Sequence, residues 1–342
     1  MTKHFAFVFP GQGSQSVGML DSWSAHAEVK RSLEEAQSAL SEDLGALMRD
    51  GPKEALALTT NTQPLMLLAD VAIYRVWIKE TGATPQLMAG HSLGEYAALV
   101  ASGVLSLTQA LPLVRFRAQA MQDAVAVGVG AMAAILGLPS EQVKTTCDAV
   151  SAEFRAAHSS ELVQAVNFNE PGQTVIAGTV AGVDQACEAL KALGAKRALK
   201  LPVSAPFHCT LMQPAAERLK EMLADTVFHA PQVPVLNNVD VLTPSAAQDI
   251  KDALFRQAYH PVLWVQTVQA MQSRGIDTIV ECGPGLVLSG FTKRIAPDLE
   301  SCSLKDWDNV QSVWLALQGN PDTHTHTSLT PSAPSAPSAN SA

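Results

Sequence analysis

The sequence predicts an α/β protein with a parallel β-sheet, into which a smaller β-α-β-β-α-β unit is inserted. Short apolar runs alternate with helical stretches in the first and last parts of the chain, as expected where helices connect parallel strands. The middle of the chain departs from this alternation and contains a hairpin signal. Hydrophobic residues make up 47% of the 342 residues and charged residues 16%, which provides enough apolar material for a packed core.

The elements of the expected core can be placed in chain order. Phe5–Phe9 is a short apolar run that stops at a Pro-Gly turn, a pattern typical of a buried parallel strand. A helix at 63–79 is expected to open with Pro64, because proline is favoured in the first turn of a helix. The other expected elements are helices at 28–40 and 95–101 and strands at 86–89, 233–237 and 278–281.

The middle of the chain predicts a second, smaller unit. Strands are expected at 131–138, 162–169, 173–178 and 196–203, and helices at 140–157 and 183–193. Glu170-Pro171-Gly172 indicates the hairpin turn between the second and third of these strands. The resulting order is the ferredoxin-like split pattern. We therefore expect a discontinuous α/β core, residues 1–126 plus 206–318, and a ferredoxin-like small domain, residues 127–205.

The end of the chain, residues 319–342, differs in composition from everything before it. It is rich in Pro, Ser, Thr and Ala, repeats the triplet PSA, and has Leu329 as its one large apolar residue. A segment with so few apolar side chains cannot offset the entropy lost on ordering. We therefore expect a disordered tail.

Charge and hydropathy exclude several classes of protein. The formal net charge of −9 at pH 7 does not suit a nucleic-acid-binding protein, which needs a basic face. The longest uncharged stretches, 96–114 and 124–140, are interrupted by polar, Gly or Pro residues and predict no membrane span. The five cysteines are scattered without a CxxC pair, so neither a disulfide framework nor a metal site is expected. A cytoplasmic protein without cofactor is the simplest interpretation.

The glycines after the first strand, in Gly11-Gln12-Gly13-Ser14-Gln15-Ser16, invite a dinucleotide-binding interpretation. That interpretation is disfavoured because Ser16 replaces the third glycine and because no strand ending in Asp or Glu follows about 20 residues later. The glycines still indicate a close approach of the backbone to another group.

The strongest chemical motif is Gly90-His91-Ser92-Leu93-Gly94, a GxSxG between an expected strand and an expected helix. In this context the motif is typical of a nucleophile elbow, whose glycines permit a strained turn that presents the serine hydroxyl. The helix N-terminus and the N–H of Leu93 would favour developing negative charge there. Ser92 is therefore the candidate nucleophile, against the alternative of an ordinary turn serine.

A serine nucleophile needs a base, and the residues alone leave two histidines open. His208 lies where the small domain returns to the core, which suits a position in the cleft between them. His260, preceded by Asp240, preserves the Ser…Asp…His order of hydrolases. Arg115 and Arg117 fall at the margins of an apolar helix stripe, where either a surface role or the binding of a carboxylate is possible.

Several separated motifs of the chain form one pattern: Gly11-Gln12-Gly13-Ser14-Gln15, Gly90-His91-Ser92-Leu93-Gly94, Arg117, Phe207-His208 and Gly283-Pro284-Gly285. In this pattern the chain resembles the malonyl-CoA:acyl carrier protein transacylase family of bacterial fatty-acid synthesis, from about residue 5 to residue 304. The resemblance implies a hydrolase-like α/β core with a ferredoxin-like insert and an active site between them.

The resemblance also implies roles for individual residues. Ser92 would be the nucleophile and His208 its base, which selects His208 over His260. The carbonyl of Gln257 would orient the histidine. The remaining implied roles are the backbone N–H groups of Gln12 and Leu93 as the oxyanion hole, Arg117 as the partner of the malonyl carboxylate, and Gln63, Asn169 and Phe207 as pocket residues.

The implied reaction is ping-pong transfer of a malonyl group from malonyl-CoA to the pantetheine thiol of acyl carrier protein, through a malonyl-serine intermediate. Malonyl-CoA and acyl carrier protein would be its partners, and we expect the enzyme to be a monomer. Candidates for a basic patch that docks the carrier protein are Lys196, Arg197 and Lys200. Three alternatives remain open: a malonyl transferase serving a polyketide synthase, a serine hydrolase using Ser92, Asp240 and His260, and a non-catalytic module that binds a carrier protein.

Overall fold

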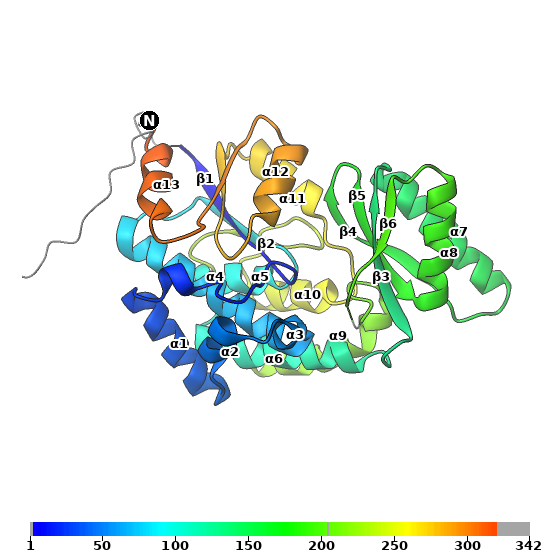
Figure 1. Ribbon diagram of the computed structural model, residues 1–342, viewed down its shortest axis with the longest axis horizontal. Coiled ribbons are helices and arrows are strands. Elements are labelled where there is room, and N and C mark those ends of the chain that lie inside the picture. The colour runs from blue at the N-terminus through cyan, green and yellow to red at the C-terminus, as the bar shows by residue number, and fades with distance from the viewer. Residues whose placement is uncertain (1–2, 204, 320–342) are drawn as a thin grey trace, which may run out of the picture.

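A five-stranded parallel sheet organises the larger part of the computed structural model, which describes residues 3–203 and 205–319 (Figure 1). Its strand order is β7-β2-β1-β8-β9, and every neighbouring pair is parallel. The strands are β1 (Phe5–Phe9), β2 (Leu87–Gly90), β7 (Val235–Leu236), β8 (Thr278–Glu281) and β9 (Glu300–Ser303). The expected parallel α/β core is confirmed. Apart from Gly319, the expected tail lies outside the described residues.

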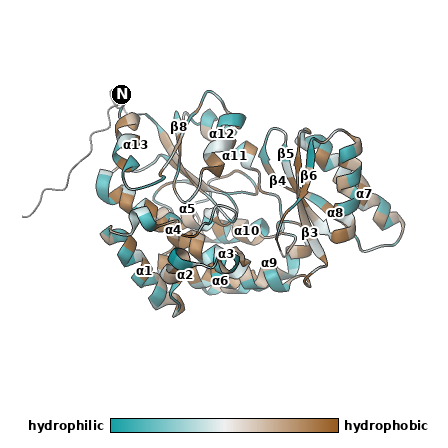
Figure 2. Cartoon of the chain, in the orientation of Figure 1, coloured by the Kyte–Doolittle hydropathy of each residue, from teal (hydrophilic) through white to brown (hydrophobic). Residues whose placement is uncertain are grey.

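Strand β1 is buried on both of its faces, which explains its continuous apolar run. Phe5, Phe7 and Phe9 point into one hydrophobic cluster, whereas Ala6 and Val8 point into another. Helices therefore cover both faces of the sheet. Figure 2 shows hydrophilic and hydrophobic residues side by side on outer helices such as α1, as expected where one helix face packs on the core.

One face of the sheet is covered by a group of helices, which includes the longest helix within the described residues. They are α1 (Ala27–Leu40), α2 (Leu44–Asp50), α3 (Lys53–Ala57), α4 (Thr59–Thr81), α5 (Gly94–Ala101), α6 (Leu107–Asp123), α9 (Gln213–Asp225), α10 (Ala247–Gln257) and α13 (Asn309–Leu317). The other face is covered by α11 (Trp264–Ser273) and α12 (Val287–Ile295). No helix of the described residues is long and apolar enough to cross a membrane.

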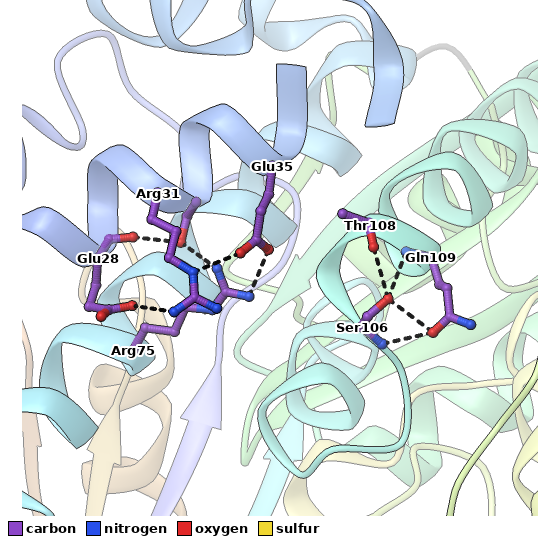
Figure 3. Close-up of polar contacts among 8 residues, drawn as sticks. Glu28, Arg31, Glu35, Arg75, Ser106, Thr108 and Gln109 are labelled. Carbon is purple, nitrogen blue, oxygen red and sulfur yellow. Dashed lines mark hydrogen bonds and ion pairs between the residues drawn. The ribbon is translucent and has the colours of Figure 1, made fainter. Parts of the chain in front are cut away.

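Polar contacts connect neighbouring helices of this group and cap the start of one of them (Figure 3). Arg75 of α4 donates to Ser32 Oγ at 2.9 Å and to Glu35 Oε2 at 2.8 Å, both on α1. Ser106 and Gln109 form a reciprocal capping box at the start of α6, which satisfies N–H groups that the first helical turn leaves free. The site-bearing helix α6 therefore begins at a well-defined residue.

Helix α4 begins earlier than the sequence predicts. It starts at Thr59, so Pro64 lies inside the helix and not in its first turn. Proline has no N–H to donate to the carbonyl four residues before it, which is that of Thr60. Arg115 Nη1 donates to this carbonyl at 2.7 Å instead, so the proline leaves no unsatisfied acceptor. Tertiary contact thus overrides the local signal.

The second sheet is antiparallel, with the strand order β4-β5-β3-β6. Its elements are β3 (Gly130–Leu136), α7 (Ser140–Ala156), β4 (Val163–Glu170), β5 (Gln173–Thr179), α8 (Val180–Ala192) and β6 (Arg197–Lys200). This is the strand order of the ferredoxin-like pattern. Helices α7 and α8 cover the face that looks away from the parallel sheet (Figure 1). The expected domain boundaries at 126/127 and 205/206 stay predictions.

The helix-free face of the second sheet looks toward the parallel sheet. Asn167 of β4 forms a β-bridge with Val262, and hydrogen bonds of 2.8 and 3.0 Å flank this bridge. Met132, Val175 and Leu201 lie on this helix-free face and line a pocket between the two sheets. Strand β6 (Arg197–Lys200) is shorter than the expected 196–203, and Leu201 and Val203, which follow it, line that pocket.

Candidate active site

The turn from β2 into α5 brings three segments of backbone into close contact. A Cβ placed on Gly90 would lie 1.8 Å from the carbonyl carbon of Gly94, and one on Gly94 would lie 2.0 Å from the oxygen of Phe9. Only glycine fits at either position. Between them Ser92 adopts a φ of 52°, a strained left-handed conformation that presents its side chain at the head of α5. The GxSxG motif therefore forms a nucleophile elbow.

His208 is the partner of the Ser92 hydroxyl. Its Nε2 lies 2.7 Å from Ser92 Oγ, and its Nδ1 lies 2.8 Å from the backbone oxygen of Gln257. Because a carbonyl only accepts hydrogen bonds, Nδ1 carries the proton and Nε2 is free to accept one from Ser92. Burial, together with the positive charge of Arg117, lowers the pKa of His208 from 6.5 to about 3. The imidazole is therefore neutral and able to act as a base at neutral pH.

The alternative pair, Asp240 and His260, is not brought to the nucleophile. Asp240 is held by Arg256 through two hydrogen bonds of 2.9 and 2.7 Å, and this contact lowers the pKa of Asp240. Within the described residues, no hydrogen bond connects either of them to Ser92. The geometry thus supports a Ser-His pair oriented by a main-chain carbonyl.

Arg117 is a buried cation that contacts neutral side chains. It is 2% exposed, and it donates to Gln63 Oε1 at 2.7 Å, to Gln257 Oε1 at 2.9 Å and, more weakly, to Ser92 Oγ at 3.3 Å. Among the residues that the structure describes, no Asp or Glu forms an ion pair with it. A buried charge of this kind is suited to an anionic ligand, because pairing would offset its desolvation. Arg115, one of the two candidates, instead pairs with Glu42 outside the pocket.

Gln12 and Leu93, whose N–H groups are the expected oxyanion hole, line the same pocket as Ser92. Leu93 follows Ser92 at the N-terminus of α5, and Gln12 belongs to the glycine loop after β1. Gly11 allows this loop to approach, since a Cβ there would lie 2.5 Å from the oxygen of His91. Within the described chain, neither N–H has a recorded intramolecular acceptor. Both are therefore available to an oxyanion formed at Ser92.

The pocket around these groups has a volume of about 200 Å³. From the core it receives Gln12, Gln63, His91, Ser92, Leu93, Arg117, Met121, Phe207 and His208; from the second sheet and the return segment it receives Met132, Asn167, Asn169, Val175, Leu201 and Val203. Asn169 Oδ1 lies 2.9 Å from His91 Nε2, so Asn169 also fixes the ring beside the nucleophile. The expected pocket residues Gln63, Asn169 and Phe207 all line this pocket.

Two buried polar residues of the site were not predicted. Asn238 Oδ1 accepts from the Ser92 N–H at 2.7 Å, and Asn238 Nδ2 donates to the Gly90 oxygen at 2.7 Å. Glu95, in the first turn of α5, is buried, and its carboxylate accepts from Gln257 Nε2 and from the Asn238 N–H. A polar residue after an apolar strand is a weak signal for Asn238. No signal singles out Glu95, because acidic residues are common in the first turn of a helix.

The three candidate docking residues have different surroundings. Lys200 faces α8, where its Nζ lies 2.6 Å from Asp184 Oδ1. Lys196 lines a separate groove with Gly137 and Gln266. Arg197 is exposed at the start of β6 and pairs in register with Leu136, on the helix-free face of the sheet. Whether these three side chains together bind a carrier protein stays a prediction.

Comparison with known proteins agrees with this geometry. A model of the acyl transferase domain family matches residues 6–299. A malonyl CoA-acyl carrier protein transacylase of Escherichia coli (strain K12) is 50% identical over 303 residues, which cover 88% of this chain and 96% of that protein. The crystal structure of an acyl-carrier-protein S-malonyltransferase from Burkholderia pseudomallei 1710b, 54% identical, superposes with a TM-score of 0.87 and covers 91% of this chain and 99% of that chain.

A further similar structure is described as a type II PKS acyl-carrier protein in complex with its malonyl-transacylase. Its matching chain is 47% identical, with a TM-score of 0.87, and the match covers 93% of this chain and 100% of that chain. The family model and these relatives span most of the chain. This protein therefore belongs to the acyl transferase domain family and, within it, to the malonyl CoA-acyl carrier protein transacylases.

Proposed function

We propose that this protein transfers the malonyl group of malonyl-CoA to the pantetheine thiol of an acyl carrier protein, and that it supplies fatty-acid chain elongation. The observation that carries the proposal is the position of Arg117. A buried guanidinium, which forms no ion pair with any Asp or Glu in the described part of the chain, lies 3.3 Å from the Oγ of a serine that is hydrogen-bonded to a neutral histidine. The serine oxygen that would attack the acyl group thus also contacts the cation that would bind the carboxylate of that group.

In the first half-reaction, Ser92 Oγ attacks the thioester carbonyl while His208 Nε2 takes the hydroxyl proton. The carbonyl electrons move onto its oxygen, which accepts hydrogen bonds from the N–H groups of Gln12 and Leu93. Each such donor is worth about 3–4 kcal/mol in the transition state. The C–S bond then breaks, the sulfur leaves with the bonding electrons, and His208 returns the proton to it. The products are CoA and a malonyl-serine ester.

In the second half-reaction the pantetheine thiol of the carrier protein enters the emptied pocket. His208 takes the thiol proton, the sulfur attacks the ester carbonyl, and the same two N–H groups stabilise the oxyanion. Collapse breaks the bond to Ser92 Oγ, which recovers its proton from His208. Throughout, Arg117 holds the malonyl carboxylate bidentately and so fixes the position of the carbonyl beside Ser92.

The cellular setting is part of the same proposal. We place the enzyme in the cytoplasm as a monomer, which agrees with five cysteines that are all free. The relative that serves a type II PKS carrier supports a second candidate function, in which this enzyme loads a polyketide carrier by the same chemistry. The two functions differ in the carrier protein and not in the acyl chemistry.

Mass spectrometry of the intact protein after mixing with malonyl-CoA tests the proposal. We expect one stable malonyl adduct in the wild type and none in Ser92→Ala, and the adduct should disappear when holo carrier protein is added. Rapid release of free malonate without carrier would instead indicate a hydrolase. Comparing kcat/KM for a fatty-acid carrier and a polyketide carrier distinguishes the two candidate pathways.

A further inference from the structure

Behind the nucleophile lies a buried carboxylate that the transfer mechanism does not use. Glu95 belongs to the first turn of α5 and is 2% exposed. Its Oε2 accepts hydrogen bonds from Gln257 Nε2 at 2.9 Å and from the backbone N–H of Asn238 at 3.0 Å. Glu95 thus contacts two residues that hold the reacting groups in place.

The first of these residues, Gln257, links three groups of the site. Its backbone oxygen accepts from His208 Nδ1, and its Oε1 accepts from Arg117 Nη2 at 2.9 Å. Besides Glu95, its Nε2 also donates to the backbone carbonyl oxygen of Ser92, at 2.9 Å. The two ends of an amide have similar shapes but opposite hydrogen-bonding character. An ionised carboxylate and a backbone carbonyl both only accept, so Glu95 and the Ser92 carbonyl together keep Nε2 on their side and leave Oε1 facing Arg117. In the reversed orientation, the amide NH₂ would face the N–H groups of the guanidinium.

The second residue, Asn238, supports the elbow itself. Its side chain bridges the Ser92 N–H and the Gly90 oxygen, and so spans the residue with the strained φ of 52°. Glu95 holds the main chain of Asn238 through its N–H. One carboxylate oxygen therefore supports both the turn that presents the nucleophile and the amide that contacts the arginine.

We propose that Glu95 is a positioning residue for malonyl transfer, and that its ionised carboxylate favours carboxylate-bearing acyl groups by keeping the Gln257 oxygen on Arg117. The inference rests on the function proposed above. The reacting atoms do not touch Glu95, so its effect passes through Gln257 and Asn238.

The ionisation of Glu95 depends on groups from several elements. Burial raises its pKa from 4.5 to about 7, whereas the hydrogen bonds from Gln257 and Asn238 and the charge of Arg117 on α6 act to lower it. Asp240, in the segment after β7, raises it further. Glu95 is therefore ionised above neutral pH and increasingly protonated below it. Once protonated, it can donate a hydrogen bond, and the Ser92 carbonyl is then the one remaining acceptor-only group among the described residues that holds the amide in this orientation.

The test measures kcat/KM for malonyl-CoA and for acetyl-CoA between pH about 6 and about 9, a range that brackets this pKa. In the wild type, we expect the malonyl-to-acetyl ratio to rise as the pH rises through 7. Glu95→Gln can present either end of its amide, so it should lower the ratio about 10-fold at high pH and make it independent of pH. Glu95→Asp still only accepts when ionised, and should retain the rise.

Glu281→Gln is a matched control, because Glu281 is also a fully buried glutamate whose pKa is raised by burial. Unlike Glu95, it accepts hydrogen bonds from the backbone N–H groups of Leu288 and Ser289, which do not line the pocket. It should keep the wild-type profile. Equal losses for both substrates in Glu95→Gln, or a ratio that still rises with pH in that variant, would overturn the inference.

Thermal unfolding of each variant shows which proteins are folded. If Glu95→Gln does not fold, Glu95→Asp decides the question, since loss of its pH-dependent rise contradicts a positioning role for the carboxylate. A wild type that transfers no malonyl group overturns the proposed function together with this inference. A wild type that transfers malonyl, accompanied by an unaltered Glu95→Gln, overturns this inference alone.

Discussion

The elbow around Ser92 and the loop around His208 hold the two reacting side chains by different means. Both residues have a positive φ, 52° at Ser92 and 65° at His208. At Ser92 the strain is held by glycines packed against backbone atoms, with gaps too small for any Cβ. The segment around His208 contains no glycine, and its imidazole is held by Gln257 and Ser92, residues distant in sequence. The elbow is thus specified locally, whereas the position of the histidine depends on the assembled fold.

Replacing a glycine of the elbow should have the largest effect. In Gly94→Ala the added Cβ would lie 2.0 Å from the Phe9 oxygen and 2.8 Å from the Pro10 oxygen, both backbone atoms that cannot move independently. We expect a loss of about 3 kcal/mol or more in the free energy of unfolding, or no folded protein. Urea unfolding followed by circular dichroism measures this.

Gly290→Ala is the control for that substitution. Gly290 lies inside α12, and the closest heavy atom to an added Cβ is the flexible Arg294 Nη2 at 3.4 Å. Alanine should stabilise this helix by about 0.5–1 kcal/mol. A Gly94→Ala protein as stable as Gly290→Ala would show that the elbow is not sterically specified.

Substituting the histidine should abolish chemistry while leaving the fold intact. Asparagine tolerates the left-handed backbone conformation of residue 208, so His208→Asn removes the base with little added strain. We expect kcat to fall about 10³–10⁴-fold. His260→Asn should change kcat by no more than about 2-fold, because His260 does not contact the nucleophile. If kcat in a steady-state assay fell more in His260→Asn than in His208→Asn, the result would instead support the hydrolase-type triad.

Removing the Arg117 side chain should distinguish recognition of the malonyl carboxylate from acyl transfer itself. Arg117→Ala leaves Ser92 and His208 in place but removes the partner of the malonyl carboxylate, so kcat/KM for malonyl-CoA should fall about 100-fold or more. Acetyl transfer should fall much less, since acetyl-CoA has no carboxylate at this position. Arg115→Ala, on the same helix and outside the pocket, serves as control. Equal losses for malonyl and acetyl groups in Arg117→Ala would rule out the carboxylate role.

The smallest expected effect is the pH dependence that His208 contributes to stability. Its pKa is about 3 when folded and 6.5 in the unfolded reference, so its contribution is fully present above pH 6.5 and is lost as the pH falls toward 3. Between pH about 7 and about 5, the wild type should lose ~2 kcal/mol more than His208→Asn. Comparing the two proteins by urea unfolding cancels other titrating groups, such as Glu95, whose raised pKa acts in the opposite direction. Parallel pH profiles would show that the imidazole is not buried in its neutral form.

Most of the secondary structure could be predicted because local signals were sufficient. Phe5–Phe9 and Thr278–Glu281 form strands at the predicted residues, and glycine limits the helices near 95–101 and 183–193 as expected. The start of α4 could not be predicted, because Arg115 satisfies the carbonyl that Pro64 leaves free. The surroundings of Lys200 could not be predicted either, since its partner Asp184 belongs to a different element, α8.

Local sequence was enough to locate Ser92, the proposed nucleophile. A GxSxG between a buried strand and a helix restricts the backbone within five consecutive residues, and that restriction is steric and local. The tertiary structure decided everything that the nucleophile needs from elsewhere. His208 lies 116 residues from Ser92 in the chain and Gln257 lies 165 residues away, and both meet it through hydrogen bonds that no local pattern encodes. Arg117 became distinct from Arg115 only through burial, because the fold places one guanidinium in the pocket and pairs the other with Glu42 outside it.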